Sequence, residues 1–348
     1  MSENYNENLN QETFGESVNS TPEVFIPYFS PEEMAKREEK RKLKKVSNAV
    51  GISLLLVTVF TFLVSFTLSF LSLLISSLTG KSDVLSAPAV NEAINILYSI
   101  LIFGGVVTTV FKMSHYRISD LVSFKKTEKG LFLPLFFFGI GFCAFGNIAA
   151  SYMDAFFSGI GIDYARPEIE NPEGVFGFLL TLISTAIVPA LLEEFAFRGI
   201  ILGSLRKFGD TFALIASAIC FGVLHSNFEQ IPFAFFVGLF LGFAVLKTGS
   251  LKVSIAVHLY NNLISVVLNY LPESVPNEIK SVVYVFLLLI TLVVGIFMLC
   301  KIDKDFFTIE KTETILSEKE KHKTFFTGGF ILAFLIINLI EASLYIVV

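Results

Sequence analysis

The sequence predicts an all-α protein, a polytopic bundle of about nine (eight or nine) membrane-spanning helices with a disordered N-terminal tail. Hydrophobic residues make up 53% of the 348 residues, and the mean hydropathy is +0.70. Only 16% of the residues are charged, whereas about a quarter are charged in a soluble domain. The apolar residues form long runs that lack the alternation of a barrel strand. Helices are therefore expected, because lipid offers the backbone no hydrogen-bond partners.

Nine stretches meet or approach the roughly 20 apolar residues that a spanning helix needs. They are residues 46–78, 90–112, 131–157, 175–204, 211–226, 231–247, 251–270, 279–300 and 326–347. The fifth and sixth stretches are short, so they could be tilted or extend beyond these limits. Residues 46–348 thus form the expected membrane domain.

Residues 1–45 are expected to form a disordered cytosolic tail. Residues 1–24 are rich in Asn, Glu and Ser and cannot bury enough apolar surface to fold. No cleavable signal peptide is expected, because the first apolar run is too long for one. A basic cluster before that run should attract anionic lipid headgroups. It comprises Lys36, Arg37, Lys40, Arg41, Lys42, Lys44 and Lys45.

The basic residues also predict an orientation. With the N-terminus in the cytosol, every connection obeys the positive-inside rule, and an odd number of spans places the C-terminus outside. The Lys-rich and Asn-rich tail favours a bacterial plasma membrane. Nucleic-acid binding is not expected, because the basic clusters flank apolar segments and contain no recognition motif. Membrane lipids are the expected surroundings of the chain.

Three of the spanning stretches carry polar residues that are costly in lipid. An ionisable residue within a span costs about 2.5–3.5 kcal/mol on insertion scales and usually faces the protein interior. Two of the four histidines of the chain lie in these stretches, together with two acids, a cation and an amide. The residues are Glu193, Glu194 and Arg198 in the fourth span, His225 in the fifth, and His258 and Asn262 in the seventh.

Sequence spacing allows these groups to converge. A tight turn centred on Gly209 separates the fourth and fifth spans, and Glu193 and His225 each lie 16 residues from it. Antiparallel helices would therefore place the two side chains at one depth. A second turn at Gly249 brings Asn262 to within one helical turn of that level, at about 1.5 Å per residue. His258 and Asn262 are spaced i, i+4 and share a helix face.

Two further features of the fourth span support a polar chamber. Glu194 and Arg198 have the i, i+4 spacing and the acid-first order that favour an ion pair. Such a pair could be structural, and it would leave Glu193 on an adjacent face. Pro189 removes one helix hydrogen bond, so a kink is expected there. Intramembrane polar residues elsewhere, such as Asn147 and Asn338, have no converging partner that spacing can identify.

The three motifs, in this order on separate helices, resemble a known family. Glu193-Glu194-xxx-Arg198, Phe221-xxx-His225 and His258-xxx-Asn262 are similar to the motifs of the CAAX-protease and bacteriocin-processing family of intramembrane proteases. This family includes the Ras-converting endopeptidases and their bacterial relatives. The resemblance covers about residues 170–270, which we take as the motif core. The N-terminal tail and the last two spans fall outside it.

The resemblance implies an endopeptidase that hydrolyses peptide or membrane-anchored protein substrates by direct attack of water. It assigns Glu193 and His225 to water activation, His258 and Asn262 to stabilising the oxyanion, and Glu194 and Arg198 to support. No cofactor is required by this scheme. The name metalloprotease is often applied to the family, however, and Zn²⁺ bound by Glu193, His225 and His258 is chemically feasible.

Two other function classes remain open from the sequence. The chain could be a transporter or channel that uses the buried charges as an ion path, although no internal repeat supports this. It could also be a catalytically silent immunity or scaffold protein that retains the fold. Within the peptidase hypothesis, both CAAX-type cleavage of a prenylated protein and the processing of secreted peptides are compatible with the motifs.

Overall fold

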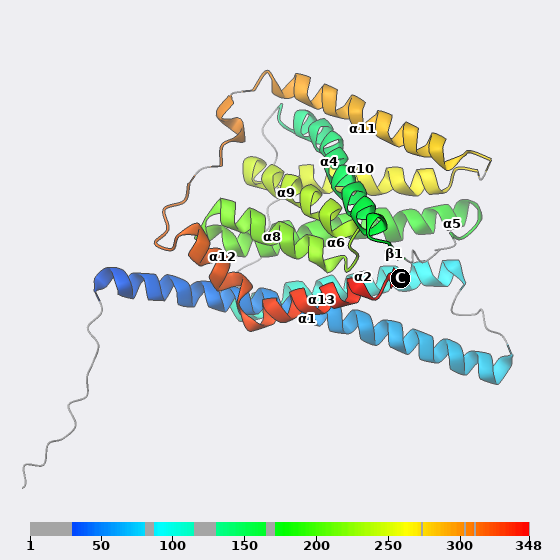
Figure 1. Cartoon of the computed structure of the whole chain (residues 1–348), viewed down its shortest axis with the longest axis horizontal. Helices are drawn as coiled ribbons and strands as arrows, with labels where there is room; N and C mark the ends of the chain where they lie inside the picture. The colour runs from blue at the N-terminus through cyan, green and yellow to red at the C-terminus, as the bar shows by residue number, and fades with distance from the viewer. Residues whose placement is uncertain are drawn as a thin grey trace, which may run out of the picture.

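The computed structural model describes residues 30–80, 87–114, 130–164, 171–272, 274–302, 304–309 and 311–347. These residues form an almost entirely helical protein, in which most helices run along the horizontal axis of Figure 1. The all-helical, polytopic class predicted from the sequence is confirmed.

The helices follow one another in up-and-down order. The first three within the described ranges are α1 (Pro31–Thr79), α2 (Pro88–Ser114) and α4 (Phe132–Gly159). A long broken helix follows, composed of α5 (Gly174–Thr181), η1 (Leu182–Ile187), α6 (Val188–Glu194), η2 (Phe195–Ile201), α7 (Leu202–Leu205) and η3 (Arg206–Phe208). The remaining long helices are α8 (Asp210–Leu224), α9 (Gln230–Thr248), α10 (Lys252–Asn269) and α11 (Asn277–Leu299).

The chain ends in short elements. The 3-10 turn η4 (Lys304–Phe307) precedes α12 (Glu318–Phe326) and α13 (Gly329–Ser343), which meet at a bend of 70°. Two-residue strands β1 (Asp163–Tyr164) and β2 (Ile346–Val347) pair antiparallel and connect the loop after α4 to the C-terminal end.

The predicted number of spans is confirmed only in part. Six helices within the described ranges are long and apolar enough to cross a membrane, or seven if the bent α12–α13 pair is one span. Each of the nine predicted stretches nevertheless contains a helix. Helix α8 has only 15 residues, and α10 falls outside the six because polar residues such as His258, Asn261 and Asn262 lower its hydropathy.

The predicted tail boundary at residue 45 differs from the structure, because α1 begins at Pro31. Ser30 and Glu33 form a capping box at its start. Glu39 accepts a hydrogen bond from the backbone N–H of Ile315 (2.8 Å), and Lys36 pairs with Glu320 at 2.7 Å. The helix extension is therefore stabilised locally and by contact with α12. Residues 1–29 lie outside the described ranges.

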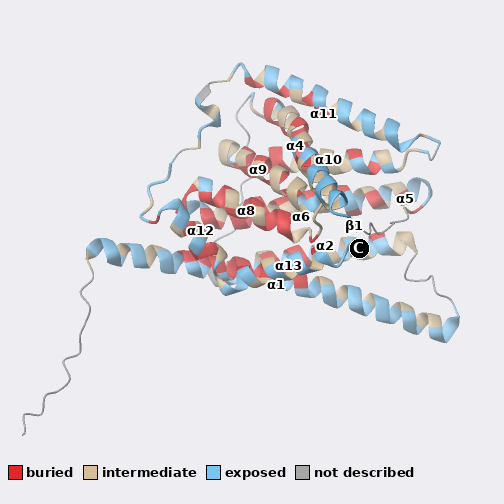
Figure 2. Cartoon of the chain, viewed as in Figure 1, coloured by how far each residue is buried: buried red, intermediate tan, exposed pale blue. Residues whose placement is uncertain are grey.

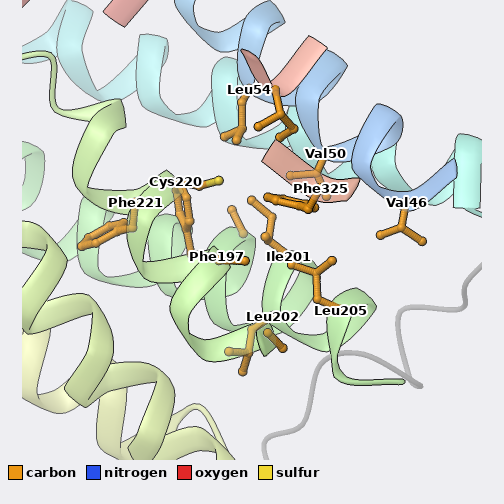
Figure 3. Close-up of a cluster of buried hydrophobic side chains, with 14 of the residues drawn as sticks. Val46, Val50, Leu54, Phe197, Ile201, Leu202, Leu205, Cys220, Phe221 and Phe325 are labelled. Atoms are coloured by element: carbon orange, nitrogen blue, oxygen red, sulfur yellow. The ribbon is translucent and has the colours of Figure 1, made fainter. Parts of the chain in front are cut away.

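The centre of the core lies where the broken helix meets α1, α8 and α12. Val50, Leu54, Phe197, Ile201 and Phe325 are buried there together (Figure 3). Buried residues concentrate in the middle of the bundle, whereas α11 and the far end of α1 are mostly exposed (Figure 2). The exposed side chains are largely apolar, as expected of surfaces that contact lipid.

Helices α4 and α11 pack backbone against backbone at two glycines. A Cβ atom added at Gly141 would collide with the backbone of Leu292, and one added at Gly295 would collide with the backbone of Phe138. Small residues that allow helix backbones to approach closely are common at helix interfaces in membranes. Because α4 also packs on α9 and α10, this contact sets one wall of the bundle.

Replacing Gly141 by Ala is expected to destabilise the protein by about 1–3 kcal/mol, because the added methyl group overpacks the contact between α4 and α11. Thermal unfolding in detergent measures the effect. Gly104→Ala in α2 is the matched control, since no atom lies within 4 Å of a Cβ placed there. An equal unfolding temperature for both variants would contradict the proposed close packing.

Candidate functional site

The broken helix that carries the first motif changes its winding on both sides of that motif. The π-helical segments η1 and η2 flank α6, and Glu193 and Glu194 are the last two residues of α6. Pro189 has no N–H to donate to the carbonyl of Thr185, four residues earlier. Short π-helical segments of this kind are frequent at functional sites. The irregularity expected from Pro189 is therefore present at the motif.

Glu194 is completely buried and forms an ion pair with Arg198. The Nη1 atom of Arg198 donates to Oε1 of Glu194 at 2.9 Å, and both side chains are at most 1% exposed. The guanidinium group also lies 4.0 Å from the ring centre of Phe221, a cation–π distance. Because each charge is neutralised locally, the two groups can remain within the apolar bundle.

His258 lies between the two carboxylates of the first motif. Its Nδ1 atom is 2.9 Å from Oε1 of Glu194, and its Nε2 atom is 3.9 Å from Oε2 of Glu193. The Glu193 side chain is 17% exposed, in contrast to the fully buried Glu194. One carboxylate thus orients the imidazole, and the other faces its second nitrogen from a more accessible position.

His225 caps the end of α8 and contacts Phe221, the aromatic residue that also lies against Arg198. Its Nδ1 atom lies 2.9 Å from the carbonyl oxygen of Phe221, and its ring packs edge-on against the Phe221 ring. The Phe221 ring also meets the His258 ring edge-on, at 6.1 Å between centres. Phe221 is therefore the shared neighbour of both histidines and of Arg198.

The residue after His225 has an unusual backbone conformation. Ser226 has φ of 47°, in the left-handed region that costs a residue with a Cβ atom about 1–2 kcal/mol. Its hydroxyl donates to Oδ1 of the buried Asn338 at 2.7 Å. The Asn338 amide in turn donates to Thr58 at 3.0 Å and to the backbone of Phe334 at 2.8 Å. Helices α1 and α13 thus hold the end of α8.

Asn262 contacts the carbonyl of Thr185, to which Pro189, four residues later, cannot donate an N–H. Its Nδ2 atom donates to the oxygen of Thr185 at 3.1 Å. The side chain of Asn261 donates to Oδ1 of Asn262 at 3.3 Å, and Tyr284 donates to Asn261 at 3.4 Å. The amide of Asn262 is therefore held between the first motif helix and α11.

A polar cavity of about 480 Å³ opens beside these residues. His225 and Asn262 line it, together with Asn147, Glu229 and Tyr284 from three other parts of the chain. Glu193 and His258 are not among its lining residues. A second, largely apolar cavity of about 680 Å³ lies between α4 and α11 and shares Asn147 and Tyr284 with the first.

The residues considered for zinc do not form a ligand set. Within the described ranges, no three His, Cys, Asp or Glu side chains converge as metal ligands would. His258 uses Nδ1 for Glu194, and its Nε2 atom already faces Glu193. The contacts of Nδ1 in His225 with a backbone carbonyl and in His258 with a carboxylate are compatible with zinc ligation through Nε2, so the spacing of the three side chains decides the question. The arrangement of Glu193, His225 and His258 therefore does not fit the zinc site that the sequence left open.

Sequence spacing missed three side chains that support the site. Asn338 and Asn147 appeared to lack converging partners, yet Asn338 bonds Ser226, and Asn147 donates to Tyr284 at 3.2 Å. Glu92 in α2 was not singled out at all, although it is buried and accepts hydrogen bonds from Ser184 and Thr181. These side chains contact helices that are distant in the sequence, so spacing cannot predict the contacts. The only signal in the sequence is that each is an isolated polar residue in an apolar run.

A family model confirms the resemblance found in the sequence. Residues 175–264 match the Rce1-like family, described as type II CAAX prenyl endopeptidase Rce1-like. This segment of the chain is Rce1-like. It runs from α5 into α10 and contains all six residues of the candidate site.

Two curated proteins are similar to parts of this chain. The "Putative membrane peptidase YdiL" of Bacillus subtilis (strain 168) is 29% identical over 148 residues, which are 41% of this chain and 55% of YdiL. The "Membrane-embedded CAAX protease MroQ" of Staphylococcus aureus (strain USA300) is 28% identical over 109 residues, 29% of this chain and 44% of MroQ. The chain thus matches about half the length of these relatives. No solved structure matches it.

The Glu194–Arg198 pair gives a stability prediction. Arg198→Met should destabilise the protein by about 3–5 kcal/mol, because it leaves the charge of Glu194 buried without a partner. The double variant Glu194→Gln with Arg198→Met should recover much of this loss, since it leaves no unpaired charge. Unfolding temperature and folded yield in detergent measure both variants. A double variant that is no more stable than Arg198→Met would contradict the buried-pair account.

Proposed function

We propose that this protein is an intramembrane endopeptidase that cleaves peptide or membrane-anchored protein substrates by direct attack of water. The observation that carries the proposal is the difference in environment between two adjacent carboxylates. Glu194 is fully buried and bonded to Arg198 and His258, whereas Glu193 is partly exposed and faces Nε2 of His258. Only Glu193 therefore retains the freedom that a general base needs.

In this mechanism Glu193 accepts a proton from water as the water oxygen bonds to the peptide carbonyl carbon. His225, which lines the polar cavity, orients that water. Breakage of the C–N bond then releases an amine, which takes up the proton from Glu193. No serine or cysteine is required, so no acyl-enzyme forms. The new C-terminal carboxylate and the amine are the two products.

Two side chains can stabilise the negative charge that develops on the carbonyl oxygen. Asn262 has two amide hydrogens, of which one bonds to Thr185 and the other can face the cavity. His258 can donate from Nε2 when its ring is protonated, because Nδ1 then donates to Glu194. A donor positioned for such an oxyanion contributes about 3–4 kcal/mol in comparable sites.

The two adjoining cavities support a substrate with a polar backbone segment next to an apolar one. His225 and Asn262 line the polar cavity, and Asn147 and Tyr284 line both this cavity and the apolar cavity between α4 and α11. We therefore expect peptides or proteins that carry their own membrane anchor. The similar protein MroQ is named a membrane-embedded CAAX protease, which supports a peptidase that acts within the membrane. An integral membrane location with the N-terminus in the cytosol completes the proposal.

Substitution of the two water-activating residues tests the proposal. Glu193→Gln and His225→Ala should each lower cleavage of a labelled membrane-anchored reporter by about 100- to 10,000-fold, the range typical of lost general-base catalysis. Purified protein in detergent or liposomes gives the rates.

Glu278→Gln is the matched control, because Glu278 is exposed in the first turn of α11. It should cleave the reporter at the wild-type rate. Wild-type turnover by both Glu193→Gln and His225→Ala would refute the proposed peptidase mechanism.

A further inference from the structure

Glu92 is a buried carboxylate that the proposed mechanism does not use. It lies in α2, outside the Rce1-like segment, and is 6% exposed. Within the described ranges, no lysine, arginine or histidine forms an ion pair with it. A carboxylate inside a membrane bundle is costly and is retained where it has a function. Its contacts therefore indicate what that function is.

The partners of Glu92 are hydroxyl groups at the start of the first π-helical segment. Ser184 donates to Oε2 of Glu92, and Thr181 donates to Oε1 at 3.5 Å. The hydroxyl oxygen of Thr181 also lies 2.9 Å from that of Tyr270, whose single hydrogen goes either to Thr181 or to the carbonyl of Pro172, 2.9 Å away. Glu92 thus joins α2 to the start of η1 and, through Thr181, to Tyr270 at the end of α10.

The segment that Glu92 holds is the one that orients Asn262. Thr185 directly follows Ser184, and the two hydroxyl groups lie 3.4 Å apart. The carbonyl of Thr185 lacks the N–H that Pro189 cannot supply, and it accepts the amide hydrogen of Asn262 instead. A shift of η1 along its axis would therefore move the acceptor away from Asn262.

From these contacts we infer that Glu92 is a positioning residue, which fixes η1 through Ser184 and Thr181 and thereby orients the amide of Asn262. This inference rests on the proposed function for its effect on catalysis. The contact between Glu92 and Ser184 does not depend on it. In this role Glu92 acts as a hydrogen-bond acceptor, so its charge is not required.

The activity test compares Glu92→Ala with Glu92→Gln. Loss of the acceptor in Glu92→Ala should lower kcat about tenfold, equivalent to about 1.4 kcal/mol in the barrier, and change KM less than twofold. Glu92→Gln keeps an acceptor oxygen and should remain within about twofold of wild type. If Glu92→Gln is as impaired as Glu92→Ala, the carboxylate charge is needed and the positioning role is refuted.

A double variant tests whether Glu92 acts through Asn262. Glu92→Ala combined with Asn262→Ala should be no slower than Asn262→Ala alone, because effects that pass through one group are not additive. A further tenfold loss in the double variant would show that Glu92 acts by another route, which overturns the inference.

A stability measurement separates this inference from the peptidase proposal. In thermal unfolding, Glu92→Ala and Ser184→Ala should together lower stability by less than the sum of the single effects, because both remove the same hydrogen bond. Strict additivity would refute the Glu92–Ser184 contact even if the enzyme is active. If this coupling is found but wild-type protein cleaves no reporter, the peptidase proposal fails and the contact remains.

Discussion

The arrangement of the site depends on one carboxylate that has no access to water. Glu194 is fully buried, and it is tolerable there only because Arg198 and His258 both bond to it. Arg198 in turn lies against the face of Phe221. The demand for local neutralisation thus places a histidine and an arginine, the latter against an aromatic ring, around Oε1 of Glu194, and the three side chains come from three helices.

This constraint explains why adjacent glutamates can have different roles. Residues next to each other on a helix point in directions about 100° apart at 3.6 residues per turn. Glu194 therefore points into the core, whereas Glu193 remains partly exposed and faces the second nitrogen of His258. The buried pair of Glu194 and Arg198 makes this part of the site rigid, and the accessible carboxylate of Glu193 remains available to react.

Much of this architecture could be predicted from the sequence because it depends on local rules. Apolar runs located the helices, and the turn expected at Gly249 exists with that residue in the left-handed conformation. The turn at Gly209 also forms, with φ of 117°. Helix spacing identified Glu194 with Arg198 as a possible pair, and the structure contains it.

Other features could not be predicted, because they depend on contacts between distant segments. The start of α1 at Pro31 reflects its contacts with α12, which lies near the other end of the sequence. Asn338 stabilises the strained Ser226 from 112 residues away. Glu92 stood in an apolar stretch without a motif, and only the fold shows that Ser184 lies beside it. Sequence spacing was also silent on whether three zinc ligands would meet.

The most direct measurement of the central claim is ¹⁵N NMR of histidine-labelled protein, since the chain has only four histidines to assign. Glu194→Gln should shift the ring nitrogens of His258, which bonds to Glu194, and leave those of His225, which bonds to the backbone of Phe221, nearly unchanged. If the His258 resonances do not move, the buried carboxylate does not hold that ring, and the account of the site is contradicted.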